Sequence, residues 1–313
     1  MIVEARVPLK LTLFGEHAVV YGKPAIAATI SEFLKVRVSP SEKFVVVSPS
    51  LNLKGVKVNL DDMRVENEQV SRLLNYVSES LSAVGDVPVK IEIESPVEPS
   101  VGLGTSAAVI VGTISAYSSF LGQDLTPMEI ARKSHEVELR VQGIGSRMDT
   151  YVESLGGIIL FNGNKEERIH SDISFVSGYF RRSMTTAEML KKVKEFKDQS
   201  VEVFSKIIDS IGSIVMEAKE YMEENKETEV GRLMYVNHGL LFSLGVTVPE
   251  IDEAVSRARY LGIKGAKISG GGAGGSVIMT SDPASGMLLR SFGAYLINSR
   301  FHEGGVTVSK RTE

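Results

Sequence analysis

A lysine, a glutamate and a histidine stand close together near the start of the chain. Apolar residues alternate with others over Val7–Leu13, a pattern that predicts a half-buried strand with Lys10 on its other face. The strand pattern breaks at Gly15, directly before Glu16 and His17. Polar residues at the end of a strand often form one wall of an active site, but they also occur on plain surfaces. These residues alone leave both interpretations open.

A second group of candidates follows a predicted strand in the first half of the chain. Residues 102–107 read G-L-G-T-S-A, and an apolar stretch continues through Tyr117. Glycines before the first turn of a helix let several backbone N–H groups surround an anion, and the helix dipole adds about half a positive charge there. A serine in that turn, Ser106, could also reach a metal ion bound to a phosphate. The segment therefore predicts a phosphate-binding loop.

Other interpretations of residues 102–107 compete with this one. A P-loop would need Gly-Lys-Ser/Thr, and no lysine follows, so we reject it. The string fits the dinucleotide pattern G-x-G-x-x-A, with Asp124 near the place of the ribose-binding acid. That pattern should directly follow a buried strand, whereas here a loop with two prolines, Ser95–Val101, follows a half-exposed one. Close packing of glycines with a Ser/Thr cap is the remaining alternative; phosphate binding outside a Rossmann fold is favoured.

A carboxylate falls on the edge of the apolar face of a predicted helix at Thr126–Gln142. The helix has a capping box and a proline at its first position, and Gly143 is a natural stop. At about 100° per residue, Glu138 borders the stripe formed by Ile130, Ser134, Val137 and Val141. Burying a carboxylate without a partner costs several kcal/mol, so Glu138 should have a cation nearby, either Mg²⁺ or a lysine. The alternative is a side chain that reaches past the stripe into solvent.

Two glycine-containing loops complete the candidates. Gly143–Asp149 places an acid at the end of a loop, ahead of an apolar strand at Gly157–Phe161, although an aspartate in a loop is usually only a turn residue. Lys267–Ser276 holds five glycines in six residues between two predicted strands, more than a hairpin needs. Such a loop suits a close approach of backbone to a ligand. A flexible linker is the alternative, and β-prone residues on both sides argue against it.

Composition narrows the class of protein. Of the 313 residues, 43% are hydrophobic and 24% charged, as in a globular protein with a large core, and the length suggests two domains. The formal charge of −4 gives no basic excess for nucleic acid, and no apolar run approaches the roughly 20 residues that span a bilayer. Without cysteine there is no disulfide, thiol nucleophile or thiolate metal site. The start of the chain reads as a strand rather than a signal peptide, so we expect a cytoplasmic protein.

The candidates lie on a mixture of helices and strands, without repeats or low-complexity segments. Strands are predicted at 35–38, 44–47, 56–59 and 89–94, and a one-sided apolar helix at 70–81. The stretch up to Tyr117 is too apolar on all sides for a surface helix and predicts a central buried one. From about Met184 helices dominate through Leu244, and another follows at Val248–Leu261. We expect a domain boundary within residues 165–185.

Four segments together resemble one enzyme superfamily. The first is L-F-G-E-H-A-V-V-Y-G-K-P-A at 13–25, the second is G-L-G-T-S-A-A at 102–108, and the third is the glycine-rich loop at 267–276. The segment L-G-V-T-V-P-E-I-D at 244–252 is similar to the one that precedes the third motif. In combination and order, over nearly the whole chain, these motifs resemble the GHMP kinase superfamily and, within it, the mevalonate kinase family.

The resemblance implies roles for the polar residues of these motifs. Asp149 matches the family's proposed catalytic base, and Lys10 matches the lysine that pairs with this base and favours the developing alkoxide. Ser106 and Glu138 match the Mg²⁺ ligands. The loop implied to hold the ATP phosphates consists of Gly102, Leu103, Gly104, Thr105 and Ser106.

The resemblance also implies the acceptor side of the site. Glu16 and His17 would lie near mevalonate, and Thr186 would line the same pocket. Gly271 and Gly272 of the glycine-rich loop would approach the substrate. The adenine pocket is not located by the sequence.

Two segments depart from the family pattern. Residues 145–149 read G-S-R-M-D where the family usually has P-S-G-x-D. Arg147 therefore adds a long cation beside the expected substrate pocket, which weakens the inference of the substrate. Leu9 precedes Lys10 where a small residue is common, which we interpret as a packing variation.

The fold implied by the resemblance is an α+β, two-domain GHMP kinase fold. A ribosomal-protein-S5-like N-terminal domain would cover residues 1–175 and a ferredoxin-like C-terminal domain 176–313, with the site in the cleft between them. The implied reaction is Mg²⁺-dependent phosphorylation of mevalonate by ATP, and the sequence is compatible with a homodimer. The alternatives are a GHMP kinase for phosphomevalonate or a sugar, a non-catalytic GHMP-fold sensor, and a NAD-binding oxidoreductase. Retention of both the base and the metal ligands argues against the sensor.

Overall fold

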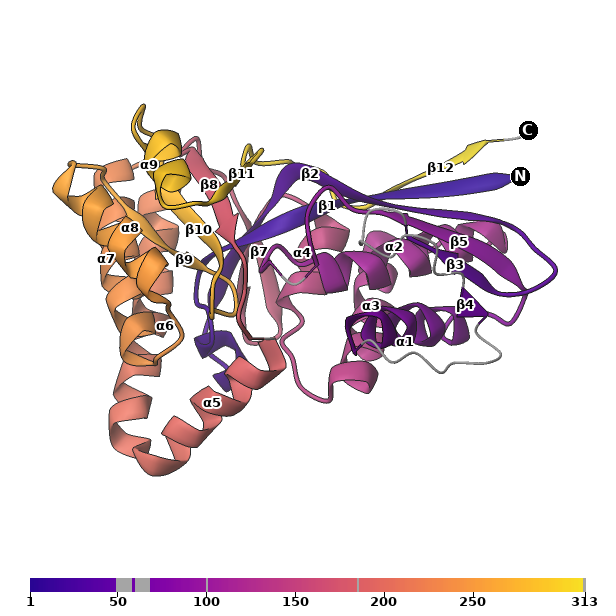
Figure 1. The fold of residues 1–313 in the computed structure, drawn as a ribbon, viewed down its shortest axis with the longest axis horizontal. Coiled ribbons are helices and arrows are strands. Elements are labelled where there is room, and N and C mark those ends of the chain that lie inside the picture. Colours follow the sequence, from indigo (N-terminus) through magenta and orange to yellow (C-terminus); the bar gives the residue numbers. More distant parts are fainter. Residues whose placement is uncertain (49–57, 60–67, 100, 185, 312–313) are drawn as a thin grey trace.

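The computed structural model describes residues 1–48, 58–59, 68–99, 101–184 and 186–311. These residues form two β-sheets, each with its own layer of helices, arranged end to end in an elongated molecule (Figure 1). The mixed α+β character predicted from the sequence is confirmed.

The first sheet contains the N-terminal strands. Its members are β1 (Ile2–Phe14), β2 (Ala25–Pro40), β3 (Val45–Val47), β4 (Val58–Asn59), β5 (Val89–Glu94), β6 (Ile158–Asn162), β7 (Lys165–Ile169) and β12 (Thr307–Arg311). The order is β12-β1-β2-β5-β3-β4, with β6 on β2 and β7 on β6. Only the β3–β5 pair is parallel among the described strands. Of the predicted strands, 35–38 lies within β2, 44–47 and 89–94 are confirmed, and part of 56–59 lies outside the described residues.

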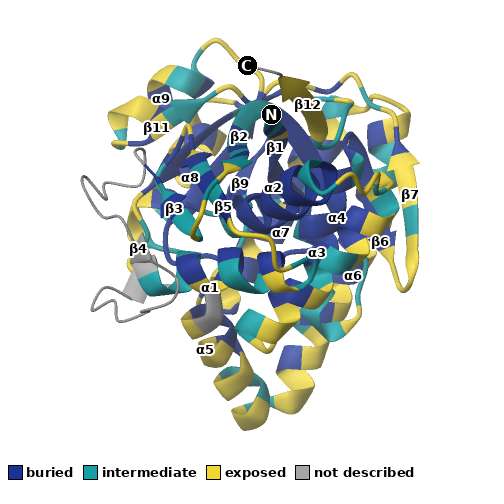
Figure 2. Ribbon diagram, turned by 90° about the vertical axis from the view of Figure 1, so that its right-hand side faces the viewer, coloured by how far each residue is buried: buried dark blue, intermediate teal, exposed yellow. Residues whose placement is uncertain are grey.

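Helices cover one side of this sheet (Figures 1 and 2). They are α1 (Glu68–Ser82), α2 (Thr105–Phe120), α3 (Pro127–Gln142) and α4 (Met148–Leu155). The prediction of a central buried helix is confirmed by α2, where nearly every residue is buried. Gly112 lets α2 approach the sheet closely, because a Cβ there would lie 2.6 Å from Cγ2 of Val36. The predicted capping box of α3 is present between Thr126 and Glu129.

Strand β1 is more buried than its alternating sequence predicts. Every residue of Val7–Phe14 is buried, because α2, α4 and the second sheet pack against the strand. The register with β2 shifts between Pro8 and Lys10, and such a bulge changes the direction of the side chains beside it. Lys10 therefore lies in the interior of the protein, not on an exposed face.

The second sheet consists of β8 (Phe175–Phe180), β9 (Ala266–Ser269), β10 (Gly275–Thr280) and β11 (Tyr295–Ile297). Its order is β11-β8-β10-β9, and all its pairs are antiparallel. The helices around it are α5 (Thr186–Gln199), α6 (Val201–Glu223), α7 (Glu227–Ser243), α8 (Pro249–Tyr260) and α9 (Ser285–Ser291). A short 3₁₀ helix, η1 (Ala18–Tyr21), packs against α6. The helical region predicted after Met184 is thus confirmed.

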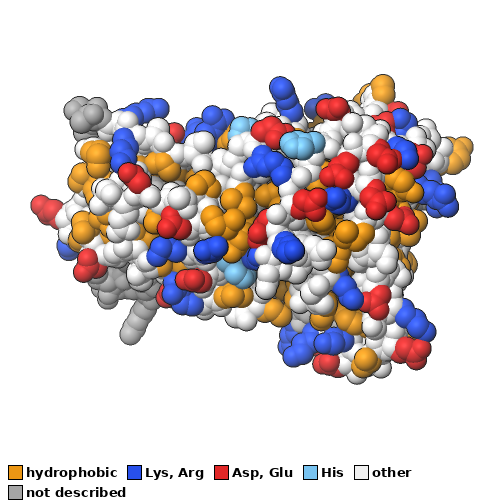
Figure 3. Space-filling model, turned by 180° about the vertical axis from the view of Figure 1, so that it is seen from behind, with side chains coloured by type: hydrophobic (Ala, Val, Ile, Leu, Met, Phe, Trp, Pro, Cys, Tyr) orange, Lys and Arg blue, Asp and Glu red, His pale blue; other side chains and the backbone are white. Residues whose placement is uncertain are grey.

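The chain passes from one sheet to the other between Ile169 and Phe175. The division into 1–175 and 176–313 stays a prediction, because β12 returns to the first sheet and pairs with β1. No helix among the described residues has the length and apolar character needed to cross a bilayer. On the face in Figure 3, acidic and basic side chains are interspersed, unlike the basic surface of a nucleic-acid-binding protein.

Candidate active site

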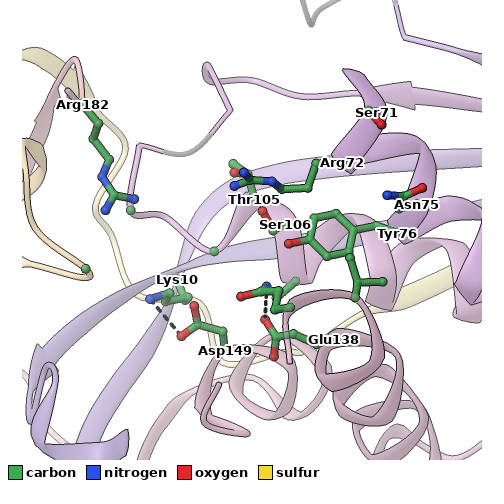
Figure 4. Close-up of a pocket in the computed structure, with 16 residues that line it drawn as sticks. Lys10, Ser71, Arg72, Asn75, Tyr76, Thr105, Ser106, Glu138, Asp149 and Arg182 are labelled. Atoms are coloured by element: carbon green, nitrogen blue, oxygen red, sulfur yellow. Dashed lines mark hydrogen bonds and ion pairs between the residues drawn. The ribbon is translucent and has the colours of Figure 1, made fainter. Parts of the chain in front are cut away.

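A cavity of about 410 Å³ lies between the helices of the first sheet and two loops of the second sheet (Figure 4). Its lining includes Lys10, Ser106, Glu138, Asp149 and Gly271. The structure thus brings together the predicted lysine, phosphate loop, helix glutamate, loop aspartate and glycine-rich loop, whereas no residue of the 13–25 and 244–252 segments lines the cavity. The five named lining residues come from β1, the start of α2, α3, the start of α4 and the loop after β9.

Lys10 and Asp149 form an ion pair in this cavity. The Lys10 Nζ lies 3.0 Å from Oδ1 of Asp149 and donates a hydrogen bond to Oγ1 of Thr12, also at 3.0 Å. Lys10 is only 3% exposed, whereas the Asp149 side chain is 30% exposed. The lysine is therefore held in place by Thr12 and Asp149, while the carboxylate stays open to a ligand in the cavity (Figure 4).

The predicted phosphate loop lies at the start of α2. Gly102 and Gly104 have φ angles of 85° and 79°, in the left-handed region that favours glycine. Gly104 is the N-cap of α2 and supplies no side chain to that end of the helix, which is the arrangement in which helix N–H groups bind an anion. The N–H of Lys10 donates to the Leu103 carbonyl at 3.1 Å and ties the loop to β1. Asp124, the acid of the dinucleotide alternative, is exposed and does not line the cavity.

Glu138 is 7% exposed, so the alternative of a solvent-facing side chain is wrong. Gln142 donates a hydrogen bond to its Oε1 at 3.3 Å, whereas Oε2 is buried and has no hydrogen-bond partner in the described part of the chain. Burial raises the pKa of Glu138, and the nearby His135 partly opposes this. Nδ1 of His135 lies 3.8 Å from Oε2 and forms an ion pair with it only when the histidine is protonated. A buried carboxylate oxygen without a hydrogen bond, at the wall of a cavity, is suited to bind a cation.

The glycine-rich loop between β9 and β10 is closely packed, so the flexible-linker interpretation is wrong. Gly272 has a φ of 86°, and a Cβ there would lie 2.3 Å from the Val246 carbonyl oxygen. Gly271 lines the cavity, while the Gly272 carbonyl accepts a hydrogen bond from Nε of Arg182 at 2.8 Å. Arg182 also lines the cavity, and burial lowers its pKa to about 10. The sequence reasoning missed Arg182, whose only signal is a pair of arginines after an apolar strand.

Glu16 and His17 lie behind the cavity wall and do not line it. Glu16 is 2% exposed and forms a buried ion pair with Lys267 of β9, which the sequence reasoning also missed. His17 Nε2 lies 3.2 Å from the Gly271 carbonyl oxygen, and burial lowers the pKa of His17 to about 4. The two residues connect the end of β1 to the glycine-rich loop, and their role in binding substrate stays a prediction.

Two other predicted residues lie elsewhere. The guanidinium of Arg147 donates to the Gly163 carbonyl at 2.9 Å and pairs with Glu166, so it faces the β6–β7 turn. The expectation of an added cation beside the substrate pocket is therefore not met. Thr186 begins α5, and its side chain lies outside the described part of the structure.

One wall of the cavity was not predicted at all. Ser71, Arg72, Asn75 and Tyr76 of α1 line it opposite the phosphate loop (Figure 4). These positions follow the helical period, on a face other than that of the buried Leu74 and Val77. The spacing was visible in the sequence, but nothing in it distinguishes such a face from a solvated one.

Comparisons with known proteins agree with the motifs. Residues 69–157 match the GHMP kinases N terminal domain, and residues 218–287 match the GHMP kinases C terminal domain. A mevalonate kinase of Saccharolobus solfataricus is 57% identical over 312 residues, which cover 99% of each chain. One from Pyrococcus furiosus is 36% identical over 88% of each chain. The crystal structure of the Methanococcus jannaschii mevalonate kinase matches with a TM-score of 0.78 and 29% identity, over 96% of this chain and 98% of that one. The chain belongs to the GHMP kinase superfamily and, within it, to the mevalonate kinase family of ATP-dependent kinases.

Proposed function

We propose that this protein transfers the γ-phosphoryl group of ATP to the 5-hydroxyl of mevalonate, as a Mg²⁺-dependent step of isoprenoid biosynthesis in the cytoplasm. The observation that carries the proposal is the Lys10–Asp149 ion pair, which shares one cavity with the phosphate loop. Phosphoryl transfer depends mainly on positioning and charge neutralisation, and this cavity offers groups for both.

The pair has a simple role in this reaction. The exposed Asp149 carboxylate accepts the proton of the 5-hydroxyl, and the Lys10 ammonium stabilises the negative charge that develops on that oxygen. The phosphate loop holds ATP through backbone N–H groups at the start of α2. The polar face of α1, with Arg72 and Asn75, forms the opposite wall of the nucleotide side.

Mg²⁺ fits the residues on the α3 side of the cavity. Glu138 offers a buried oxygen without a hydrogen-bond partner, and Ser106 offers a hydroxyl at the start of α2. Mg²⁺ prefers one or two protein ligands together with substrate phosphates and water, and the carboxylate and the hydroxyl at this wall would supply the protein ligands. When bound, the ion would neutralise charge on the transferred phosphoryl group.

Replacing Glu138 with glutamine should raise the Mg²⁺ concentration needed for half-maximal activity by about 10-fold or more, because the amide lacks the negative charge that binds the ion. Titration of the ADP complex with Mn²⁺, followed by electron paramagnetic resonance, should show a matching loss of metal affinity. Glu136→Gln, on the exposed face of the same helix, is the matched control. Unchanged metal affinity in Glu138→Gln would remove Glu138 from the metal site.

Arg182 is the candidate to bind the mevalonate carboxylate, because it brings a guanidinium to the side of the cavity near Gly271. Loss of a charged hydrogen bond costs about 1.5–3 kcal/mol, so Arg182→Gln should raise KM for mevalonate by roughly 10- to 150-fold. Arg181→Gln, at the exposed neighbouring position, should leave KM unchanged. An Arg182→Gln variant that changes only KM for ATP would contradict this assignment.

One assay tests the proposed function itself. The purified protein, with ATP and Mg²⁺, should release ADP with mevalonate and not with phosphomevalonate, homoserine or galactose. Turnover with another acceptor instead of mevalonate would overturn the substrate, and binding of ATP without any turnover would favour a sensor. The homodimer stays a prediction, which sedimentation equilibrium would test.

A further inference from the structure

Glu153 is a buried carboxyl group that no step of the proposed reaction uses. Its side chain is 0% exposed, and it lies on α4 one helical turn after Asp149, on the same side of the helix. Neither of its oxygens has a hydrogen-bond partner in the part of the chain that the structure describes. Buried polar groups in folded proteins are nearly always paired, so an orphaned one beside an active site calls for a physical reason.

The carboxyl group touches the phosphate loop. A Cβ on Gly104 would lie 2.0 Å from Oε1 of Glu153 and 2.9 Å from Cγ of Lys10. The Glu153 carboxyl and the Lys10 stem therefore both contact the backbone of Gly104. Because the Lys10 N–H donates to the Leu103 carbonyl, the loop is held against the strand at this same point. Glu153 thus stands where the phosphate loop meets the Lys10–Asp149 pair.

The surroundings of Glu153 favour its neutral form. Burial is the main reason why its pKa is raised well above the ordinary value, Asp149 and Glu138 raise it further, and Lys10 opposes them. Asp149 belongs to α4, Glu138 to α3 and Lys10 to β1. The backbone of the phosphate loop at Gly104 also contacts the Glu153 carboxyl group. An ionised Glu153 would compete with Asp149 for Lys10 and would place negative charge beneath the bound phosphates of ATP.

We propose that Glu153 is a positioning residue, a neutral carboxylic acid that keeps the phosphate loop at a fixed separation from the Lys10–Asp149 pair without adding charge to the site. The proposal rests on the proposed function in that the loop is taken to bind ATP phosphates. The shape of the Glu153 side chain matters in this role, and its ability to ionise does not.

A series of variants separates shape from charge. Glu153→Gln has the same shape and no charge, and it should keep kcat and the affinity for MgADP within about threefold of the wild type. Glu153→Asp and Glu153→Ala shorten or remove the support, and they should weaken MgADP binding about 10- to 100-fold, since small displacements in an active site have effects of this size. Infrared difference spectra at neutral pH should show a protonated-carboxyl band in the wild type that is absent in Glu153→Gln.

Val152→Ala controls for a general loss of packing in α4. Val152 is also fully buried, and it belongs to an apolar cluster with Met148 and Ile159. The substitution should lower Tm without changing MgADP affinity. If Glu153→Gln lowered the affinity for MgADP by more than about 10-fold, or if the wild type lacked the infrared band, Glu153 would not be a neutral acid in this role. Wild-type nucleotide affinity in Glu153→Ala would overturn the positioning role. Neither readout involves the acceptor, so both stand even if mevalonate proves to be the wrong substrate.

Discussion

Replacing Asp149 with asparagine should lower kcat for mevalonate phosphorylation by about 10³-fold, close to 4 kcal/mol in the barrier. The amide has the shape of the carboxylate, but it cannot accept the proton of the hydroxyl and no longer neutralises Lys10. Because the phosphate loop and Glu138 are unchanged, KM for ATP should stay within about threefold. Steady-state ADP release, with each substrate varied in turn, measures both quantities.

Asp124→Asn is the matched control for this variant, because it makes the same substitution at an exposed aspartate outside the cavity. It should have the wild-type rate. A near-normal rate in Asp149→Asn would mean that Asp149 does not act as the base. The carboxylate would then serve only as the partner that orients Lys10.

Replacing Glu16 with glutamine should lower the free energy of unfolding by about 3–5 kcal/mol. The substitution leaves the ammonium of Lys267, which is 0% exposed, without its counter-ion in the interior. Denaturant unfolding measures this loss as a lower midpoint. The effect should be larger than that of breaking an exposed ion pair, because both side chains of this pair are buried.

The double variant Glu16→Leu/Lys267→Met shows what the pair contributes. Burial raises the pKa of Glu16 and lowers that of Lys267, so loss of hydration outweighs their mutual attraction. Removing both charges should therefore restore stability to near the wild-type value. Glu227→Gln breaks the exposed pair with Lys264 and should cost less than about 1 kcal/mol. A double variant as unstable as Glu16→Gln would show that the pair stabilises the fold by itself.

The sequence predicts those parts of the site that depend on local pattern. Helical geometry placed Glu138 on the core side of α3, and its burial is confirmed. The glycines ahead of an apolar helix predicted the loop at the start of α2, and they lie there in the left-handed region. The capping box and the central helix follow from short-range rules in the same way.

Long-range packing limits the prediction of the rest. Lys267 reads as an ordinary polar residue of a short strand until β9 comes beside the end of β1. Arg182 is held at the cavity by its hydrogen bond to Gly272. Gly272 is distant in the chain, so the sequence does not reveal this contact. Strand β1 looks half exposed because its sequence alternates, although layers from both sheets bury it. Arg147 looked like a neighbour of the substrate because it stands in the loop before Asp149, and only the fold shows that its guanidinium turns to the β6–β7 turn.

The return of β12 to β1 has a consequence for how this enzyme can be divided. The register pairs Ile2 with Arg311, so the described ends of the chain lie side by side (Figure 1), and the second sheet is an insertion within the first. A fragment of residues 1–175 would leave one edge of β1 unpaired, and such an edge invites association with other chains. A circular permutant that joins the two ends and opens the chain elsewhere would keep the β1–β12 pairing and the strand that carries Lys10 intact.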